Sequence, residues 1–167
     1  MFDLKPLSKE AITGALARAE RYRLLNEAGE AESICLDVLN VDSDNQQALV
    51  MLLLALTDQF HSGPRDIVSR AREVLPRLQD EYARAYYAGI ICERRAKALL
   101  ERGARGSGVM AYEWLREAMS WYEGAEALRP PGNDDAVLRW NTCARLLNSH
   151  PHIKPRTEEA VEPLFLE

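Results

Sequence analysis

The sequence predicts an all-α protein, and three features carry that prediction. Apolar residues recur at intervals of three and four along most of the 167 residues, which is the spacing that places side chains on one face of a helix. Alternating runs of β-branched residues and Asn-Gly or Asp-Gly turns, the signals of paired strands, do not occur in the sequence. Short clusters of Gly, Pro, Ser, Asp and Asn separate the periodic segments, so we expect seven helices joined by tight turns.

The first half of the chain is expected to form four helices. The first ends at Gly29, and the second ends at the turn Asp42-Ser43-Asp44-Asn45. The third covers about residues 46–60 and is apolar on all sides, which indicates a helix buried between neighbours. Pro64 suits the first turn of the fourth helix, and Pro76 ends or kinks that helix.

The second half is expected to form three further helices and a tail. The fifth helix begins near Asp80 and keeps its helical spacing for about six turns, roughly 33 Å. A flexible loop over residues 103–108 separates it from the sixth helix, which ends at Pro130-Pro131-Gly132-Asn133. The seventh helix covers about residues 136–148. Three prolines in residues 149–167 predict an extended or disordered tail.

Composition and charge favour a folded cytoplasmic protein that binds neither membranes nor nucleic acids. The net charge is −5, whereas nucleic-acid-binding proteins usually present a basic surface to the phosphates. The longest apolar run, residues 48–56, is shorter than the roughly 20 residues that span a bilayer, and the N-terminus is unlike a signal peptide. Cys35, Cys92 and Cys143 lie far apart without a CxxC motif, so we expect buried thiols in a reducing compartment.

Common catalytic and cofactor-binding motifs are missing from the sequence, so we expect a protein that is not an enzyme and holds no cofactor or metal. HExxH, GxSxG, GxxxxGK[ST] and a GxGxxG after a strand do not occur. His150-Pro151-His152 lacks the further ligands of a zinc site, and Asp42-Ser43-Asp44 lacks the glycine of a calcium loop. The basic run Arg94-Arg95-x-Lys97 suits a solvated helix face, with an anionic partner or a peptide carboxylate as the alternative.

Three segments share a pattern of small and large residues that suits closely packed helix pairs. The clearest is Ala118-x-x-x-Tyr122-x-x-Ala125-x-x-Leu128-x-Pro130. An earlier one is Ala31-x-x-x-Cys35-x-x-Val38-Leu39-x-Val41-Asp42, and the fifth helix contributes Ala85-x-x-Ala88-Gly89-x-x-Cys92. These segments resemble tetratricopeptide repeats, and residues 130–145 are similar to bacterial proteins of this repeat type.

The resemblance covers residues 10–148. It implies an α-α superhelix of about three antiparallel helix pairs plus a C-terminal capping helix, in a single domain over residues 1–148. One helix pair cannot bury both of its faces, so neighbouring pairs stack into a continuous core. In this family a concave groove holds a partner, which implies a non-catalytic module that binds a peptide or protein segment. The alternative is a self-associating scaffold, such as a homodimer.

The resemblance also implies which residues line that groove, on the third, fifth and seventh helices. They are Val50, Met51, Leu54, Tyr86, Tyr87, Ile90, Glu93, Arg94, Leu138, Arg139, Thr142 and Arg145. Apolar and aromatic side chains with a charged rim suit a bound peptide or helix. We therefore expect the working surface on these three helices.

Overall fold

A computed structural model describes residues 1–157, and this part of the chain is all-helical, which confirms that the protein is of the all-α class. It contains seven α helices, no strand and two short 3-10 turns. The helices are α1 (Ile12–Leu24), α2 (Ala28–Val41), α3 (Gln46–Thr57), α4 (Ile67–Val74), α5 (Glu81–Arg102), α6 (Ser107–Leu128) and α7 (Asp135–Ser149). The 3-10 turns are Lys9–Ala11 and Leu75–Arg77.

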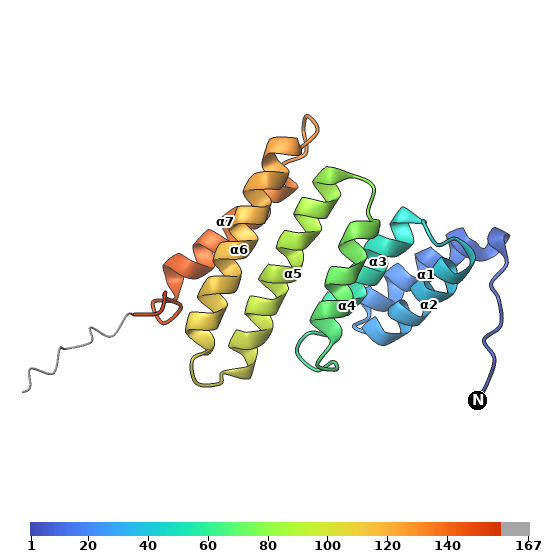
Figure 1. The fold of residues 1–167 in the computed structure, drawn as a ribbon, viewed down its shortest axis with the longest axis horizontal. Coiled ribbons are helices and arrows are strands. Elements are labelled where there is room, and N and C mark those ends of the chain that lie inside the picture. The colour runs from blue at the N-terminus through green and yellow to red at the C-terminus, as the bar shows by residue number, and fades with distance from the viewer. Residues whose placement is uncertain (158–167) are drawn as a thin grey trace, which may run out of the picture.

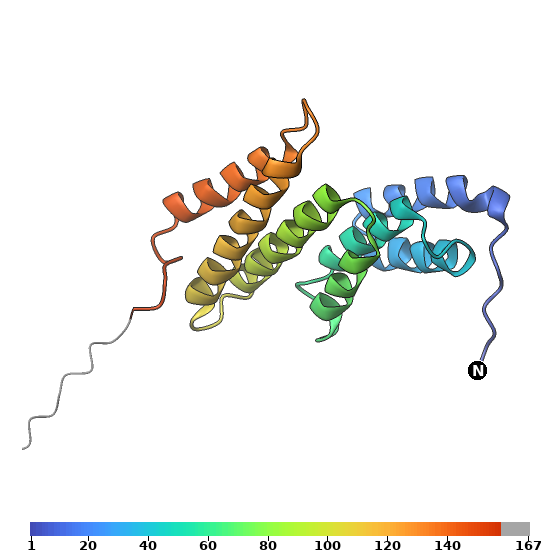
Figure 2. The ribbon, with the colours of Figure 1, turned by 45° about the horizontal axis from the view of Figure 1, so that its top comes forward.

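The helices stand side by side in one row, with each packed against the next along the chain (Figure 1). Besides its chain neighbours α2 and α4, the helix α3 also contacts α1 and α5. Viewed from a second direction, α7 and α1 lie at opposite ends of the row with α3 and α5 between them (Figure 2). This arrangement places side chains from α3, α5 and α7 within reach of one another.

Two helix starts follow the capping chemistry of the sequence. The Asn45 side chain accepts a hydrogen bond from the Ala48 backbone N–H at 2.9 Å, and Asp80 accepts one from the Ala83 N–H at 3.3 Å. Each cap satisfies one of the backbone donors that a helix leaves free at its N-terminus. The expected starts of the third and fifth helices are therefore confirmed.

Helix boundaries differ from expectation near two loops. The third helix ends at Thr57 rather than near residue 60, and α4 begins at Ile67 rather than at Pro64. The Ile67 N–H donates a hydrogen bond to the Pro64 carbonyl, so Pro64 belongs to a turn that precedes α4 rather than to the helix itself. The sixth helix begins at Ser107, inside the glycine-rich segment that was expected to be a loop. Positive φ angles at Gly103 and Gly106 let the chain reverse its direction within residues 103–106, so α6 can start directly after them.

The interior consists of two apolar clusters, one formed mainly by α1–α4 and the other by α5–α7. Leu54 and Tyr87 pack against both clusters and join them. Cys35, Cys92 and Cys143 are all buried and free, as predicted, and burial raises the pKa of each thiol to about 12. Within residues 1–157, no helix is long and apolar enough to cross a bilayer.

Gly89 sets the close approach of α5 and α6. A Cβ at this position would lie 2.5 Å from the Tyr122 ring, whose side chain is fully buried. That distance is shorter than any ordinary carbon–carbon contact, so even a methyl group would displace the ring or the helix. Tyr122 thus fills the space that the missing side chain leaves.

Gly89→Ala is expected to lower the free energy of unfolding by about 1–3 kcal/mol, because the added methyl group overpacks the contact with Tyr122. Gly124→Ala is the matched control, since a Cβ there meets no atom within 4 Å. Because alanine is the better helix former, this control should gain about 0.5–1 kcal/mol. Urea unfolding of both variants measures the difference, and equal effects would contradict the packing argument.

The chain beyond α7 returns to the helical body. Residues 150–157 form no helix, yet Ile153 is only 4% exposed and belongs to the cluster of α5–α7. The His152 carbonyl lies so close to Gly108 that a side chain at that position would collide with it. Of the tail expected over residues 149–167, Ser149 belongs to α7 and residues 158–167 lie outside the described part.

Ile153→Ala is expected to destabilise the protein by about 2 kcal/mol or more, because it leaves a cavity in the cluster of α5–α7. Lys154→Ala, which changes an exposed neighbour, should stay within about 0.5 kcal/mol of the original. Thermal unfolding of both variants provides the measurement. An unchanged melting temperature for Ile153→Ala would show that the segment contributes nothing to the core.

Candidate functional site

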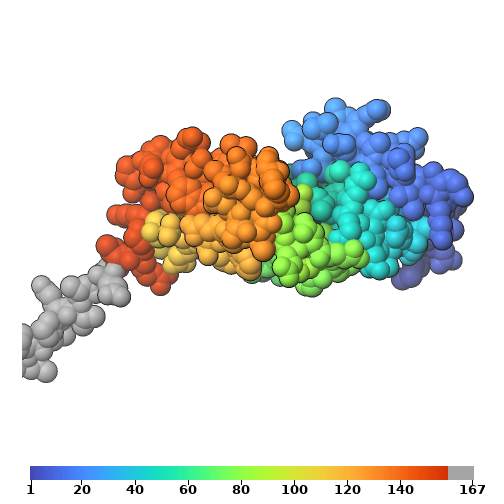
Figure 3. All heavy atoms as spheres, turned by 90° about the horizontal axis from the view of Figure 1, so that it is seen from above, coloured from blue at the N-terminus to red at the C-terminus, as the bar shows by residue number. Residues whose placement is uncertain are grey.

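One face of α5, between α3 and α7, carries two pockets. Aromatic side chains of the N-terminal half of α5 line the first, which we call the aromatic pocket. Charged side chains of the C-terminal half line the second, which we call the cationic pocket. Tyr82, Tyr86, Arg94, Lys97 and Glu101 follow one another at helical spacing, so a single helix face supplies both pockets. Figure 3 shows the whole molecule from above, with the α6–α7 end at the left and the α1–α2 end at the right.

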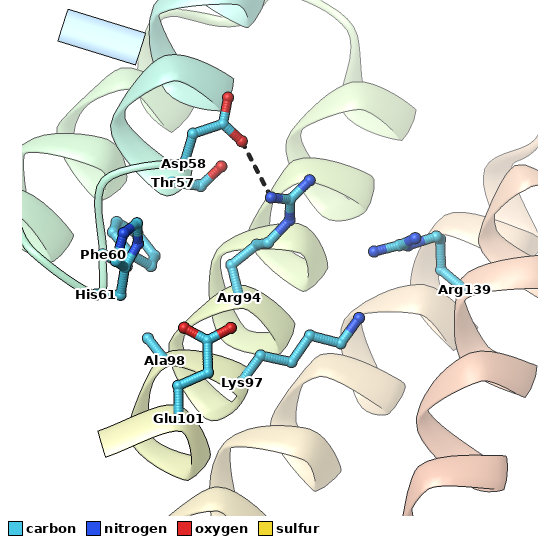
Figure 4. Close-up of a pocket in the computed structure, with 9 residues that line it drawn as sticks. All are labelled: Thr57, Asp58, Phe60, His61, Arg94, Lys97, Ala98, Glu101 and Arg139. Atoms are coloured by element: carbon cyan, nitrogen blue, oxygen red, sulfur yellow. Dashed lines mark hydrogen bonds and ion pairs between the residues drawn. The ribbon is translucent and has the colours of Figure 1, made fainter. Parts of the chain in front are cut away.

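The cationic pocket has a volume of about 250 Å³ and is built by three separate segments. Thr57 and Asp58 come from the end of α3, and Arg139 comes from α7. Figure 4 shows the side chains of α5 between them, with Arg94 directed toward Asp58. The lining residues are Thr57, Asp58, Phe60, His61, Arg94, Lys97, Ala98, Glu101 and Arg139.

Asp58 links three segments on one side of the cationic pocket. Its carboxylate accepts a hydrogen bond from Nε of Arg23 on α1 at 2.7 Å. It accepts another from Nη1 of Arg94 on α5 at 3.0 Å. Hydrogen bonds between ionised groups are stronger than neutral ones, so this bridge fixes the Arg94 side chain at the edge of the pocket.

Glu93 forms a buried anchor beneath the pocket. Its side chain is fully buried, and its two oxygens accept four hydrogen bonds from three residues. The Tyr122 hydroxyl on α6 donates at 2.7 Å, and Lys97 Nζ on α5 donates at 2.6 Å. Arg139 on α7 donates twice, from Nε at 3.1 Å and from Nη2 at 2.7 Å. The forked geometry of the guanidinium suits such paired contacts to one carboxylate.

The protonation states of the Glu93 partners follow from their surroundings. Burial raises the pKa of Tyr122, and the neighbouring Glu93 carboxylate raises it further, so the hydroxyl remains a donor. For Arg139, burial is the largest single effect and lowers the pKa, but the charge of Glu93 together with the neighbouring Tyr122 and Tyr86 outweighs it and leaves the pKa raised. The cluster therefore holds Arg139 as a charged group; the Arg139 side chain is 29% exposed and the Lys97 side chain is 37% exposed.

The charge of this site differs in sign from that of the whole chain. The site contains four cationic side chains and three carboxylates, of which two are partly or fully exposed and the third is the buried carboxylate of Glu93. The cations are Arg23, Arg94, Lys97 and Arg139, and the exposed carboxylates are Asp58 and Glu101. The site thus carries a small positive excess on a protein whose net charge is −5, and this favours an anionic ligand group.

The aromatic pocket has a volume of about 550 Å³ and is walled by stacked tyrosines. The ring of Tyr86 stacks on Tyr82 with centroids 5.8 Å apart and meets Tyr87 edge-on at 5.1 Å. Burial raises the pKa of Tyr86 to about 12, so the phenol stays neutral. The Tyr82 hydroxyl donates to Oδ1 of Asn133 at 3.3 Å and ties the tyrosines to the turn before α7. Such rings offer apolar area with polar tips to a ligand.

The residues expected to line a groove fall into three groups. Five of them line the two pockets: Val50, Tyr86, Tyr87, Arg94 and Arg139. Four lie wholly or partly in the interior: Met51, Leu54, Ile90 and Glu93. Three lie on α7 outside both pockets: Leu138, Thr142 and Arg145.

Several residues of the site were not expected from the sequence, above all Tyr82, Asp58 and Glu101. Tyr82 lies one turn before Tyr86 and shares its helix face, so helical spacing could have identified it. Asp58 has no local signal, because its role depends on cations from α1 and α5. Lys97 was identified only as part of a basic run, although it lies four residues from Glu93.

Comparison with known proteins yields no match among family models, curated proteins or solved structures. Within residues 1–157, no group of three or more His, Cys, Asp or Glu side chains lies close enough together to hold a metal ion.

Glu93→Gln is expected to lower the free energy of unfolding by about 3 kcal/mol, because it leaves the charges of Arg139 and Lys97 without their buried partner. Glu126→Gln is the control, since that carboxylate pairs with Arg129 on the exposed surface of α6. Its change should be about 0.5 kcal/mol or less. Urea unfolding measures both, and a similar small effect for the two variants would show that Glu93 is not an anchor.

Proposed function

We propose that this chain is a tetratricopeptide-like binding module, and that the face of α5 holds an extended peptide or protein segment without catalysing a reaction. The observation that carries the proposal is the pair of pockets on one face of α5, aromatic at one end and cationic at the other. Alternate helices of the row, α3, α5 and α7, supply the walls. A superhelix of helix pairs would present these alternate helices on a common face.

The spacing of the two pockets suits an extended ligand. Tyr86 and Lys97 are eleven residues apart on α5, which corresponds to about 16 Å at 1.5 Å per residue. An extended peptide rises about 3.3 Å per residue, so five or six residues would connect the pockets. Such a peptide would place an apolar or aromatic side chain on the tyrosines and an acidic group beside Arg94 and Arg139.

The pairing of the charged groups supports binding rather than catalysis. Glu93 is fully buried and already accepts four hydrogen bonds, so it is not free to take a proton from a substrate. The Thr57 hydroxyl donates to the Leu54 carbonyl within its own helix, at 2.8 Å, rather than to a base. The remaining charged groups of the pocket are suited to hold a ligand by charge and hydrogen bonding.

A second candidate is self-association, which exposed leucines at the two ends of the row favour. Leu24 and Leu25 at the end of α1 are 82% and 60% exposed, and Leu138 on α7 is 62% exposed. Static light scattering across a hundredfold range of concentration tests this candidate. A constant monomer mass excludes it, whereas a dimer that Leu138→Ser converts to a monomer would support it.

The peptide proposal is tested by selecting binders from a displayed library of random peptides and measuring their affinity by calorimetry. Tyr82→Ala and Arg94→Gln should each weaken binding at least about tenfold, equivalent to 1.4 kcal/mol. Both changes are expected to preserve the fold, because Asp58 keeps its bond to Arg23 and Tyr82 lies at the edge of the tyrosine stack.

Trp121→Ala and Arg116→Gln are the matched controls for that experiment. Both side chains are exposed on α6, and neither lines the two pockets. They should change affinity less than about twofold, well under 1 kcal/mol. Failure to select any binder, or loss of binding only in these control variants, would overturn the proposal.

A further inference from the structure

The two ends of the α5 face carry opposite charges. The cationic pocket lies along the C-terminal half of the helix, whereas two carboxylates, Asp80 and Asp135, line the aromatic pocket at its N-terminal end. Asp80 directly precedes α5, and Asp135 is the first residue of α7. The start of α5 and the turn before α7 lie on the same side of the row (Figure 1). The tyrosine rings therefore share their pocket with two acidic groups.

Both carboxylates of the aromatic pocket are exposed and lack an ion-pair partner. Within residues 1–157, no Lys or Arg side chain forms an ion pair with either of them. The nearby cations have acidic partners of their own, since Arg129 pairs with Asp134 at 3.6 Å and Arg139 with Glu93 at 2.7 Å. Each carboxylate lies at a helix N-terminus, but the partial charge there, about half a unit, offsets only part of the full negative charge.

The charge of Asp135 acts on all three tyrosines of the pocket. Burial is the largest cause that raises the pKa of Tyr82, Tyr86 and Tyr87, and the Asp135 carboxylate raises the pKa of each further. Arg139 acts in the opposite direction, on Tyr86. A carboxylate that disfavours negative charge on these phenols favours positive charge beside them. The aromatic rings act in the same sense, because a ring face attracts a cation within about 6 Å of its centre.

We propose that the aromatic pocket takes a lysine or arginine side chain of the bound peptide. The aliphatic stem packs on the stacked rings of Tyr82 and Tyr86, and the charged end lies beside Asp80 and Asp135. This assignment rests on the proposed function and sharpens it, because such a side chain is apolar along its length and charged only at its end. The pocket volume of about 550 Å³ is ample for one side chain of this kind.

The assignment fixes the charge pattern of the ligand. Tyr86 and Lys97 lie about 16 Å apart along α5, and an extended chain covers that distance in about five or six residues. The peptide thus carries a basic residue on the tyrosines and, five or six positions away, an acidic residue beside Arg94 and Arg139. A peptide with the same charge at both positions meets a like charge at one end of the face, which disfavours it.

The alkyl cation n-butylammonium, which reproduces the end of a lysine side chain, tests the pocket without a peptide. At constant ionic strength it should shift the NMR amide signals of Tyr82, Tyr86 and Asp135 with saturation, whereas neutral n-pentanol, of similar size, should not. Asp80→Asn and Asp135→Asn should each weaken its binding by about threefold or more. Both variants should stay folded, because asparagine is as good an N-cap as aspartate.

Glu113→Gln is the matched control for the loss of one negative charge. Glu113 is exposed on α6 and lines neither pocket, so its removal should leave the binding of n-butylammonium unchanged. Shifts that do not saturate, or that n-pentanol reproduces, would overturn the proposal. An equal loss of binding in Glu113→Gln and Asp135→Asn would also overturn it, because it would show attraction by the overall charge and not by the pocket.

A peptide selected in the library experiment separates this inference from the proposed function. Exchanging its basic residue for norleucine, which keeps the stem and removes the charge, should weaken binding by about fivefold or more. Asp135→Asn should then weaken the original peptide but not the norleucine peptide. Selected peptides with an uncharged residue on the tyrosines, and with affinity that Asp135→Asn leaves unchanged, would reject the cationic side chain while the proposed function stands. Saturable binding of n-butylammonium by a chain that selects no peptide would reject the proposed function while the preference of the pocket for an alkyl cation stands.

Discussion

The buried carboxylate of Glu93 is the interaction on which the site depends. A charge removed from water is costly unless it is paired and hydrogen-bonded, and here one residue from each of α5, α6 and α7 supplies donors. These three helices meet at a single point because Lys97, Tyr122 and Arg139 converge on Glu93. Any shift of α6 or α7 relative to α5 would leave part of that carboxylate unsatisfied, so the network fixes the register of the helices.

The same network organises the surface above it. Arg139 and Lys97 form ion pairs with Glu93, and the exposed parts of the same two side chains line the cationic pocket. Gly89 contributes by letting the Tyr122 ring enter between α5 and α6, which brings its hydroxyl to the carboxylate. A buried structural charge thus produces the positive surface to which we assign ligand binding. The aromatic pocket depends on the same packing, since Tyr86 lies 5.9 Å from Tyr122, centroid to centroid.

The helical content could be predicted from the sequence because its causes are local. The apolar spacing, the caps at Asn45 and Asp80 and the burial of the cysteines all follow from residues close in sequence. The early start of α6 could not be read in this way, since a glycine-rich segment serves equally well as a loop or as a turn closed by positive φ. Burial of Ile153 was also missed, because a proline-rich tail gives no local sign of the cluster that receives it.

The site could be predicted only in part, because it depends on contacts between side chains that are distant in the sequence. The resemblance led us to expect Tyr86, Tyr87, Arg94 and Glu93 in a groove, and the first three line the two pockets on α5. What Glu93 does, however, depends on side chains 29 and 46 residues away. Sequence spacing within one helix carries no information about which side chains of α6 and α7 arrive at that point.

The most direct test of this account is a double-mutant cycle that combines Glu93→Gln with Arg139→Gln and measures unfolding by urea. If the buried pair organises the helices, the two changes should be strongly non-additive, with a coupling free energy of about 1.5 kcal/mol or more. Losses that add to within about 0.5 kcal/mol would show that the two residues act independently and would contradict the account.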